Sequence, residues 1–503
     1  MRRLLHWLWV GLDGLRKVLH LVLLLLIFGL IGALFSSPIP LVPDKAALVI
    51  APQGPLVEQF SGDPLERAVA ETVSQAAPET RLRDVIDAIE AARKDPRISS
   101  IYLDLGGLDG GGTAKLQEVA RALDDFRKSG KPVIAFGEYF DQAQYYLAAH
   151  ADEIYLDPQG IAYIDGFANY GVFVKEALDK LDVDWNVFRV GQYKSAVEMF
   201  TRNDMSPAER EESLAWLNSV WGTWKADVAR ARNIEPAALQ EYADNAPAAL
   251  RAAGGDLAKV ALDAGLVTDL RGRYEVEERL AEITGEDEDE HSYQGIDYLA
   301  YLASVNSSRA LSSKASDKVA VIIAAGEILP GEQTPGTIGS DTLAEELREA
   351  RFDDDVKAVV LRIDSPGGST FASEVIRREV DALRADGKPV VASMSTLAAS
   401  GGYYIAMDAD RIVASPATLT GSIGIFAMFP TFQRTLERVG VHVDGVGTTA
   451  LSGEFSPVRP MSQATRDVLQ QSIEHEYRRF ITQVAQSRKQ PVETIDAIAQ
   501  GRV

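Results

Sequence analysis

The chain of 503 residues contains no cysteine, which excludes disulfides, thiolate metal sites and a cysteine nucleophile. Positive charge is also scarce, because 51 Lys and Arg stand against 73 Asp and Glu, a net charge of −22. Nucleic-acid binding needs a concentrated basic surface, so this balance argues against a nucleic-acid partner. Histidine is rare as well, with six in the whole chain, which limits the choice of a general base.

The composition that remains is that of a globular protein, with 46% hydrophobic and 25% charged residues. The length is sufficient for two or three domains, each with its own hydrophobic core. The chain is therefore expected to fold into packed domains rather than to be mainly disordered.

One long apolar run lies near the N-terminus. Residues 18–35, VLHLVLLLLIFGLIGALF, contain no Asp, Glu, Lys or Arg and have about the length that crosses a bilayer core. A cleaved signal peptide is the alternative, but IGALFSS offers no clear Ala-x-Ala site. Arg2, Arg3, Arg16 and Lys17 precede the run. The sequence thus predicts an uncleaved transmembrane helix with its N-terminus in the cytoplasm and the remaining chain across the membrane.

The chain contains one unit twice. The tetrapeptide GKPV begins at Gly130 and again at Gly387, and DKAALVIAP from Asp44 resembles DKVAVIIAA from Asp317. Each copy has the pattern of strand, helix, strand, helix, strand, with short β-branched apolar runs as the strands. This alternation predicts an α/β fold with mainly parallel sheets covered by helices on both faces.

Composition also marks the join between the copies, where an acidic run over 283–295 and a serine-rich stretch over 304–317 separate them. The predicted divisions are an N-terminal segment with the membrane anchor over 1–43, a first domain over 44–290, a linker over 291–316 and a second domain over 317–503. The first copy continues through residues 258–280, for which the second has no equivalent. This difference between the copies leaves open whether the chain ends at its natural C-terminus.

The stretch STLAASGGYY, residues 395–404, places Ser400 where a strand ends and a helix begins. Helix N-termini present free N–H groups that stabilise a developing oxyanion. DSPGGS, residues 364–369, follows the preceding strand in the same way, and such strand ends converge in a parallel sheet. We predict an oxyanion hole formed by the N–H groups of Gly368 and Gly401. Taken alone, each glycine pair also fits a plain turn.

Ser400 has no evident histidine partner. His442 and His475 are the two histidines of the second copy, and no motif links either to the serine. G-x-S-x-G does not occur around Ser400, which argues against an α/β-hydrolase elbow. A lysine can act as the base only when neutral, and at an ordinary pKa near 10.4 roughly one lysine in 2,500 is neutral at pH 7. A catalytic lysine must therefore be buried away from acids.

The two copies differ at the positions that matter for a dyad. VGQYKSAVEMF in the first copy aligns with VGTTALSGEF in the second, so that Lys194 corresponds to Ala450. Ser400 in turn corresponds to Gln142 or Ala143. Each copy has one polar candidate that the other lacks, a pattern that fits a single dyad divided between two domains. Diverged duplicates differ at many positions, and an ordinary surface lysine also fits Lys194.

Four motifs, DSPGGS, AASGGYYIA, TGSIGIF and GQYKSAVEMF, occur together and in order. With them the chain resembles the long, duplicated form of signal peptide peptidase A over nearly its whole length. These are bacterial membrane-anchored serine proteases of the Clp-protease/crotonase-like superfamily. The resemblance implies two tandem Clp-protease/crotonase-like domains from an internal duplication, preceded by one transmembrane helix.

The resemblance also implies roles for single residues. Ser400 matches the nucleophile, Lys194 matches the general base, and Ser422 in TGSIG matches a hydroxyl that orients the lysine. The oxyanion positions are assigned to Gly368 and Gly401. The implied reaction is endopeptidase cleavage through an acyl-enzyme, for which no metal or other cofactor is needed.

Further expectations concern partners and location. The family implies a homotetramer that cleaves remnant signal peptides and other hydrophobic peptides. It implies a single-pass protein of the bacterial inner membrane with its catalytic domains on the periplasmic side. The family also continues past GRV, where this chain stops at Val503.

Two other function classes use the same features. A crotonase-like acyl-CoA enzyme would direct paired backbone amides at a thioester oxygen. An inactive membrane scaffold would bind partners without chemistry. Labelling of Ser400 by a fluorophosphonate probe distinguishes an activated serine from both.

Overall fold

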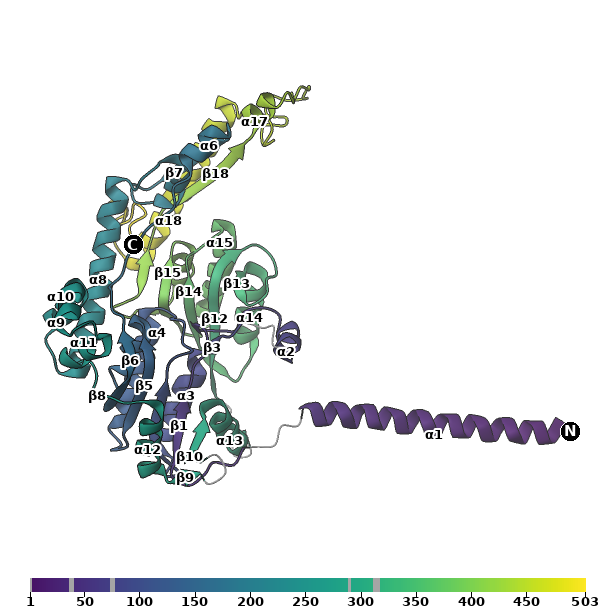
Figure 1. Ribbon diagram of the computed structural model, residues 1–503. Helices are drawn as coiled ribbons and strands as arrows, with labels where there is room; N and C mark the ends of the chain where they lie inside the picture. The colour runs from purple at the N-terminus through teal and green to yellow at the C-terminus, as the bar shows by residue number, and fades with distance from the viewer. Residues whose placement is uncertain (1, 36–39, 73–76, 288–290, 311–316) are drawn as a thin grey trace.

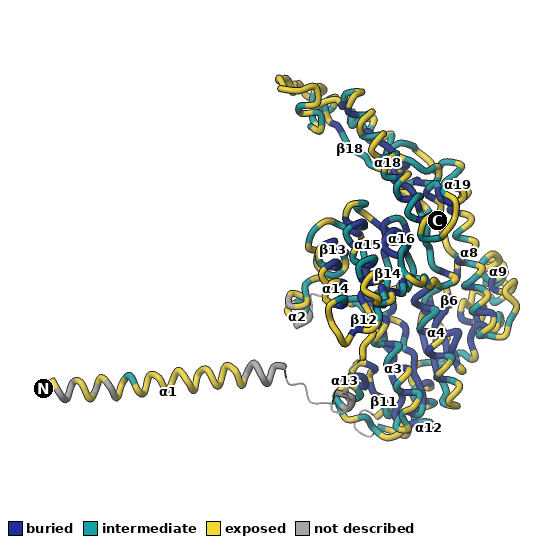
Figure 2. Tube along the Cα trace, turned by 180° about the vertical axis from the view of Figure 1, so that it is seen from behind, coloured by how far each residue is buried: buried dark blue, intermediate teal, exposed yellow. Residues whose placement is uncertain are grey.

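The computed structural model describes residues 2–503 except 36–39, 73–76, 288–290 and 311–316. Figure 1 shows two sheet-containing halves side by side, an arm that extends from them, and the long helix α1 (Arg2–Phe35) projecting away from the rest. The buried residues gather in the two halves, whereas α1 and the far end of the arm are mostly exposed (Figure 2).

The first half is built on a six-stranded parallel sheet in the order β11-β1-β4-β5-β6-β8. Its strands are apolar and buried because helices cover both faces. The elements of this half are β1 (Ala46–Ile50), β2 (Leu56–Val57), α2 (Pro64–Thr72), β3 (Thr80–Arg81), α3 (Leu82–Lys94), β4 (Ile98–Asp104), α4 (Thr113–Arg127), β5 (Val133–Phe140), α5 (Gln142–Ala148), β6 (Glu153–Ala162), α6 (Lys175–Lys180), β7 (Asp184–Val190), a 3₁₀ turn (Ser195–Val197), α7 (Glu198–Thr201), α8 (Pro207–Arg232), α9 (Pro236–Asp244), α10 (Ala246–Ala252), α11 (Leu257–Asp263), β8 (Asp269–Leu270), α12 (Arg273–Thr284), β9 (Glu286–Asp287), β10 (Ser292–Tyr293), β11 (Gly295–Asp297) and α13 (Tyr298–Ala310).

The second half repeats this plan with a parallel sheet in the order β13-β12-β14-β15-β16, and β17 pairs with the end of β15. Its elements are β12 (Lys318–Leu329), β13 (Gly336–Gly339), α14 (Ser340–Phe352), β14 (Val356–Ser365), α15 (Thr370–Ala385), β15 (Val390–Ala399), α16 (Gly401–Ala406), β16 (Arg411–Val413), β17 (Leu419–Gly421), β18 (Ile425–Thr431), α17 (Gln433–Arg438), α18 (Gln463–Arg488) and α19 (Val492–Ile498). The predicted α/β class and its duplicated strand–helix order are confirmed.

The two halves are joined by an antiparallel ribbon between β7 and β18, in which Val190 pairs with Ile425 and Asp184 with Thr431. In Figure 1 this ribbon runs along the arm together with α6, α17 and α18. In this ribbon, a strand of the first half pairs directly with a strand of the second half. The domains predicted over 44–290 and 317–503 are therefore interlocked rather than separate.

The linker predicted over 291–316 begins too early. Strand β11 pairs with β1 at the edge of the first sheet, and α13 adds the buried side chains of Tyr298, Tyr301 and Leu302 to the first core. These apolar residues outweigh the polar composition around them, because an exposed sheet edge and a hydrophobic face both need covering. The last part of the predicted linker, residues 311–316, lies outside the described residues.

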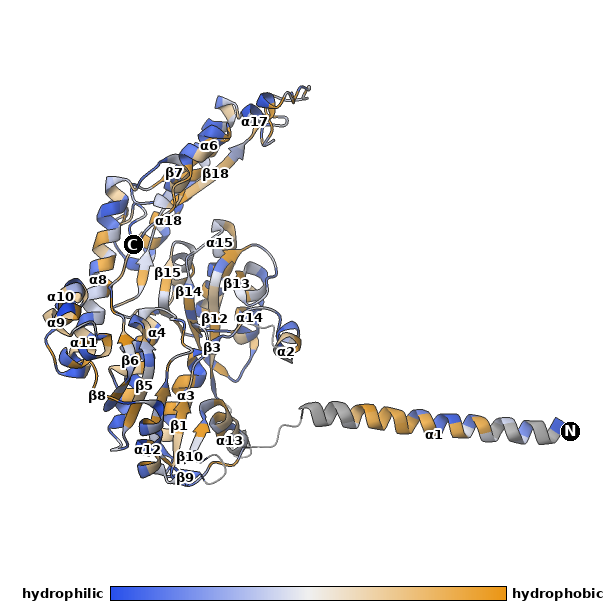
Figure 3. Ribbon diagram, in the orientation of Figure 1, coloured by the Kyte–Doolittle hydropathy of each residue, from blue (hydrophilic) through white to orange (hydrophobic). Residues whose placement is uncertain are grey.

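Helix α1 includes the run predicted to cross a membrane. Its apolar residues follow a more polar first part (Figure 3), and the side chains of residues 30–35 lie outside the described residues. Within the described part of the chain, no helix combines the length and apolar character that a membrane crossing requires. The membrane anchor over residues 18–35 thus stays a prediction.

Candidate active site

The carboxyl ends of β14 and β15 open onto a cavity of about 540 Å³ between the two halves. This is where open parallel sheets place ligand sites, because loops and helix N-termini converge at that edge. The first half contributes Lys194 to its lining, and the second half contributes Ser400 and Ser422. Neither His442 nor His475 is among the described residues that line it.

Ser400 lies in the turn between the last residue of β15 and the first residue of α16. Its backbone has φ 54° and ψ −115°, a conformation uncommon for a residue with a side chain. The Ser400 N–H donates to the Gly421 carbonyl at 2.8 Å, which holds the turn. Among the described residues, its side chain makes no capping bond to α16. The hydroxyl is therefore available for other contacts.

That hydroxyl meets the amine of Lys194. The distance from Lys194 Nζ to Ser400 Oγ is 3.0 Å, although the two residues are far apart in the sequence. Lys194 follows β7, which the ribbon with β18 carries to the second half. The side chain is buried, with the residue 6% exposed. Burial lowers the pKa of Lys194 to about 8, against an opposing influence of Glu212.

Ser422 holds the same amine from another side. Both its carbonyl oxygen and its hydroxyl lie 2.9 Å from Lys194 Nζ. Ser422 also has a positive φ, 49°, a backbone conformation uncommon for a residue with a side chain. With Ser400, these contacts fix the amine at three points.

Residues 500–502, which carry no recognisable motif, support this arrangement. The Arg502 carbonyl accepts from the Ser422 N–H at 2.6 Å, and the Gln500 carbonyl accepts from the Tyr193 N–H at 2.8 Å. Gly501 lies between these two residues, and a Cβ on it would lie 2.6 Å from the backbone nitrogen of Lys194. Tyr193, next to the lysine, and Ser422 are thus held by backbone contacts from a segment that requires glycine at position 501.

The glycine loop after β14 lies against the start of α16. Gly367 and Gly368 have φ of 100° and 152°. Ile328 bonds to the loop through the Gly367 carbonyl and the Ser369 N–H, so this bridge leaves the Gly368 N–H unused. A Cβ on Gly401 would lie 3.1 Å from the Gly368 nitrogen. The structure therefore brings the two predicted oxyanion donors together beside Ser400.

Glu212 is the acidic group that most affects the lysine. It lies on α8, lines the same cavity and is buried. Burial raises the pKa of Glu212 to about 7. A carboxylate that is partly protonated near neutral pH opposes the neutral form of Lys194 less than a fully charged one would.

The first half has a second strand-to-helix turn at the corresponding place, between β5 and α5. There Asp141 is the N-cap, and its carboxylate accepts the N–H groups of Ala143 and Gln144 at 2.8 and 2.7 Å. Relative to its helix, Asp141 thus holds the position of Ser400, one residue before the predicted Gln142. The Gln142 side chain accepts from the Gly166 N–H at 2.8 Å.

Comparisons with known proteins show which chains this one is similar to. The model of peptidase family S49 matches residues 125–285 and 382–503. The chain is 45% identical to "Protease 4" of Salmonella typhi, covering 91% of this chain and 74% of that protein. It is 42% identical to "Protease 4" of Haemophilus influenzae, covering 84% and 68%. It is 32% identical to "Serine protease SPPA, chloroplastic" of Arabidopsis thaliana, covering 82% and 60%.

Proposed function

Because the chain belongs to peptidase family S49 and is a serine protease, we propose that it cleaves peptides with Ser400 as nucleophile and Lys194 as general base. The observation that carries this proposal is the 3.0 Å distance between the lysine amine and the serine hydroxyl across the two halves. A base must lie within hydrogen-bond reach of the proton that it removes. Lys194 meets this condition.

The charge state of Lys194 also suits a base. With a pKa of about 8, about one molecule in ten has the neutral amine at pH 7, compared with roughly one in 2,500 for an ordinary lysine. Burial thus supplies the base that histidine provides in other serine proteases.

The reaction then follows from the geometry. Neutral Lys194 accepts the Ser400 proton while Oγ bonds to the peptide carbonyl carbon, and the electron pair moves to the carbonyl oxygen. The N–H groups of Gly368 and Gly401 stabilise that oxyanion. When the C–N bond breaks, the Lys194 ammonium protonates the leaving amine, which gives an ester on Ser400. Lys194 next deprotonates a water that attacks the ester, and the proton returns to Ser400 as the acid leaves.

Ser422 orients the base during these steps. Its carbonyl and hydroxyl oxygens accept hydrogen bonds from the Lys194 amine. The nitrogen lone pair of the neutral form can then face Ser400. A flexible lysine side chain would otherwise lose this alignment to rotamer freedom.

For the substrates we propose hydrophobic peptides, remnant signal peptides included. Apolar side chains of Trp216, Ile425 and Phe426 line the cavity beside the dyad. We further propose a single-pass anchor over residues 18–35 in the bacterial inner membrane, periplasmic catalytic halves and a homotetramer. The resemblance of the four sequence motifs to signal peptide peptidase A supports these assignments.

The test uses the single variants Ser400→Ala and Lys194→Ala and a hydrophobic fluorogenic peptide. We expect both variants to lose at least about a thousandfold in kcat, because dyad members act as a unit. Normal turnover by either folded variant would rule out the dyad. A fluorophosphonate that fails to label the wild-type protein would favour the acyl-CoA or scaffold alternatives.

A further inference from the structure

The strand that leads to Ser400 leaves its ladder just before the nucleophile. Ile363 of β14 pairs with Met394 of β15, but the next pairing of β14, at Ser365, is with Ala398. Residues 395–397 therefore form a bulge without backbone partners in β14. A bulge re-aims the chain that follows it, and here that chain ends in Ser400.

The N–H of Leu397, the last residue of the bulge, is satisfied by a side chain. Asp364 Oδ1 accepts this N–H at 3.0 Å. The other oxygen, Oδ2, lies 2.5 Å from Nζ of Lys115 on α4 of the first half. Lys115 is 6% exposed, and its amine also donates to the Gly111 carbonyl at 2.9 Å. Lys115 of the first half thus binds the Asp364 carboxylate, and this carboxylate in turn accepts the N–H of the bulge.

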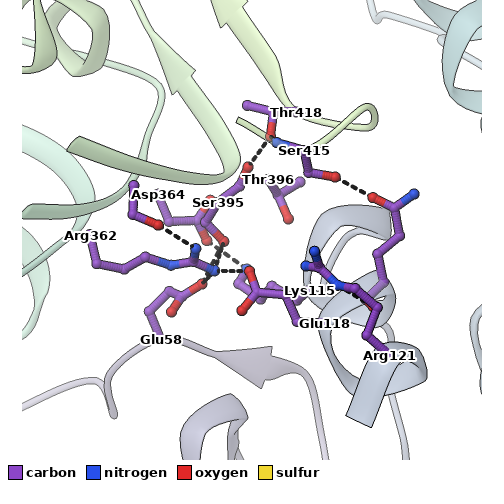
Figure 4. A network of polar contacts seen from close by, with 12 residues as sticks. Glu58, Lys115, Glu118, Arg121, Arg362, Asp364, Ser395, Thr396, Ser415 and Thr418 are labelled. Atoms are coloured by element: carbon purple, nitrogen blue, oxygen red, sulfur yellow. Dashed lines mark hydrogen bonds and ion pairs between the residues drawn. The ribbon is translucent and has the colours of Figure 1, made fainter. Parts of the chain in front are cut away.

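The other two bulge residues are tied to the first half as well (Figure 4). Thr396 Oγ1 donates to the same Gly111 carbonyl at 3.5 Å. Ser395 Oγ donates to Glu58 at 2.5 Å. Arg362 of β14 lies between the acids Glu58 and Glu118, at 2.7 and 2.6 Å. All three bulge residues therefore contact groups that the first half supplies or holds in place.

We propose that Lys115 is a positioning residue for the nucleophile, acting through Asp364. This inference rests on the proposed role of Ser400. Asp364 lies just before the loop that carries Gly367 and Gly368, and Leu397 lies just before Ser400. One ion pair thereby fixes the spacing between the oxyanion loop and the nucleophile turn. The first half supplies the base through Lys194 and the alignment of the serine through Lys115.

The charge-removing double variant K115M/D364N gives the cleanest test. Each single change leaves one charge of the buried or half-buried pair without its partner, whereas the double change removes both and preserves the acceptor for the Leu397 N–H. We expect the double variant to melt close to the wild-type temperature but to label with fluorophosphonate at least about tenfold more slowly. We also expect kcat to fall by a similar factor with little change in KM, because small misplacements of reacting groups have large effects on rate.

The matched control is E118Q, three residues further along α4, which removes another cross-half charge but leaves Arg362 paired with Glu58. We expect its labelling rate to stay within about twofold of wild type. Wild-type labelling by folded K115M/D364N would overturn the proposal, as would failure of that variant to fold, which would indicate a purely structural role. Unchanged labelling of Ser400→Ala would instead show that the proposed nucleophile is wrong.

Discussion

The two strand-to-helix turns, at Asp141 in the first half and Ser400 in the second, occupy the same place in duplicated sheets and have opposite properties. Asp141 has an ordinary extended backbone, with φ −76°, and satisfies the start of α5 with a capping box. Ser400 has φ 54°, and its side chain leaves the start of α16 without a cap. The capped turn resembles an ordinary stabilised helix start, whereas the uncapped turn keeps its N–H groups for another acceptor.

The two turns thus differ in features that matter for a reactive serine, namely backbone strain and the charge beside the helix N-terminus. A capping carboxylate at the start of α16, like that of Asp141 at the start of α5, would repel an oxyanion that forms beside the helix N-terminus. At the second turn an uncharged serine in a strained conformation stands in place of that acid, beside the predicted donors Gly368 and Gly401. Ser400 thus lacks the side-chain cap that Asp141 provides, and its backbone strain is of the kind that clusters at functional sites.

Among the variants that test the difference between the two turns, Gly401→Ala is expected to have the largest effect on kcat. The new Cβ would meet Ser373 Oγ at 2.7 Å and the Gly368 nitrogen at 3.1 Å, which displaces both oxyanion donors. We expect kcat to fall by about 10²–10³-fold, as when an oxyanion donor is removed. Steady-state hydrolysis of a hydrophobic peptide measures this. Gln142→Ala, at the first position of α5, is the control and should leave kcat within about twofold.

The pH dependence comes next in size. As the proposed general base, Lys194 acts in its neutral form, and because its pKa is about 8, activity should rise with pH and level off above pH 9. Between pH 9 and pH 6 we expect about a hundredfold loss, tenfold for each pH unit below 8. A profile of kcat/KM against pH measures it.

Glu212→Gln provides the control on that profile. The charged carboxylate raises the pKa of Lys194, so its removal should shift the rising limb to lower pH. A limb that moves to higher pH, or a profile that is flat from pH 6 to 9, contradicts the assignment of Lys194 as the base.

A smaller loss is expected from Ser422→Ala. The lysine amine keeps the Ser422 carbonyl but loses the hydroxyl contact at 2.9 Å. We expect kcat to fall by about tenfold, which corresponds to the loss of one hydrogen bond to a catalytic group. Ser422→Thr retains the hydroxyl and should recover part of the rate, and equal rates for the alanine and threonine variants would count against an orienting role.

The smallest effect is expected in the first half. Asp141→Ala removes the cap of α5 and should lower the free energy of unfolding by about 1 kcal/mol. Because α5 lies outside the cavity of the dyad, kcat should not change. Urea unfolding and peptide hydrolysis on the same preparation test both statements, and a tenfold drop in kcat would show that the capped turn takes part in the reaction.

The sequence carried enough information for the α/β class, the duplication and the two site residues. The periodicity of apolar residues and the β-branched runs predict the strands. Lys194 and Ser400 each occur in only one of the two copies, which indicates a shared site. The pairing of β7 with β18 was not predictable, because antiparallel partners so distant in the sequence leave no local pattern. Strand β11 was missed because an acidic run and a serine-rich stretch conceal a short buried segment.

Lys115 and Asp364 illustrate the same limit within the site. Lys115 is one of 51 basic residues, and its proposed role depends on a bulge in β15 that becomes visible only when two strands are in register. Gly501 likewise gives no signal until the backbone beside Lys194 is seen to need its small size.

In the proposed dyad, the first half supplies Lys194 and the second half supplies Ser400. The most direct test is mass-spectrometric mapping of the residue that a fluorophosphonate modifies, with labelling rates for the wild-type protein and Lys194→Ala. The account predicts a single adduct on Ser400 and a labelling rate at least about a thousandfold lower in the lysine variant. An adduct on another residue, or an unchanged rate at Ser400 without the lysine, would contradict it.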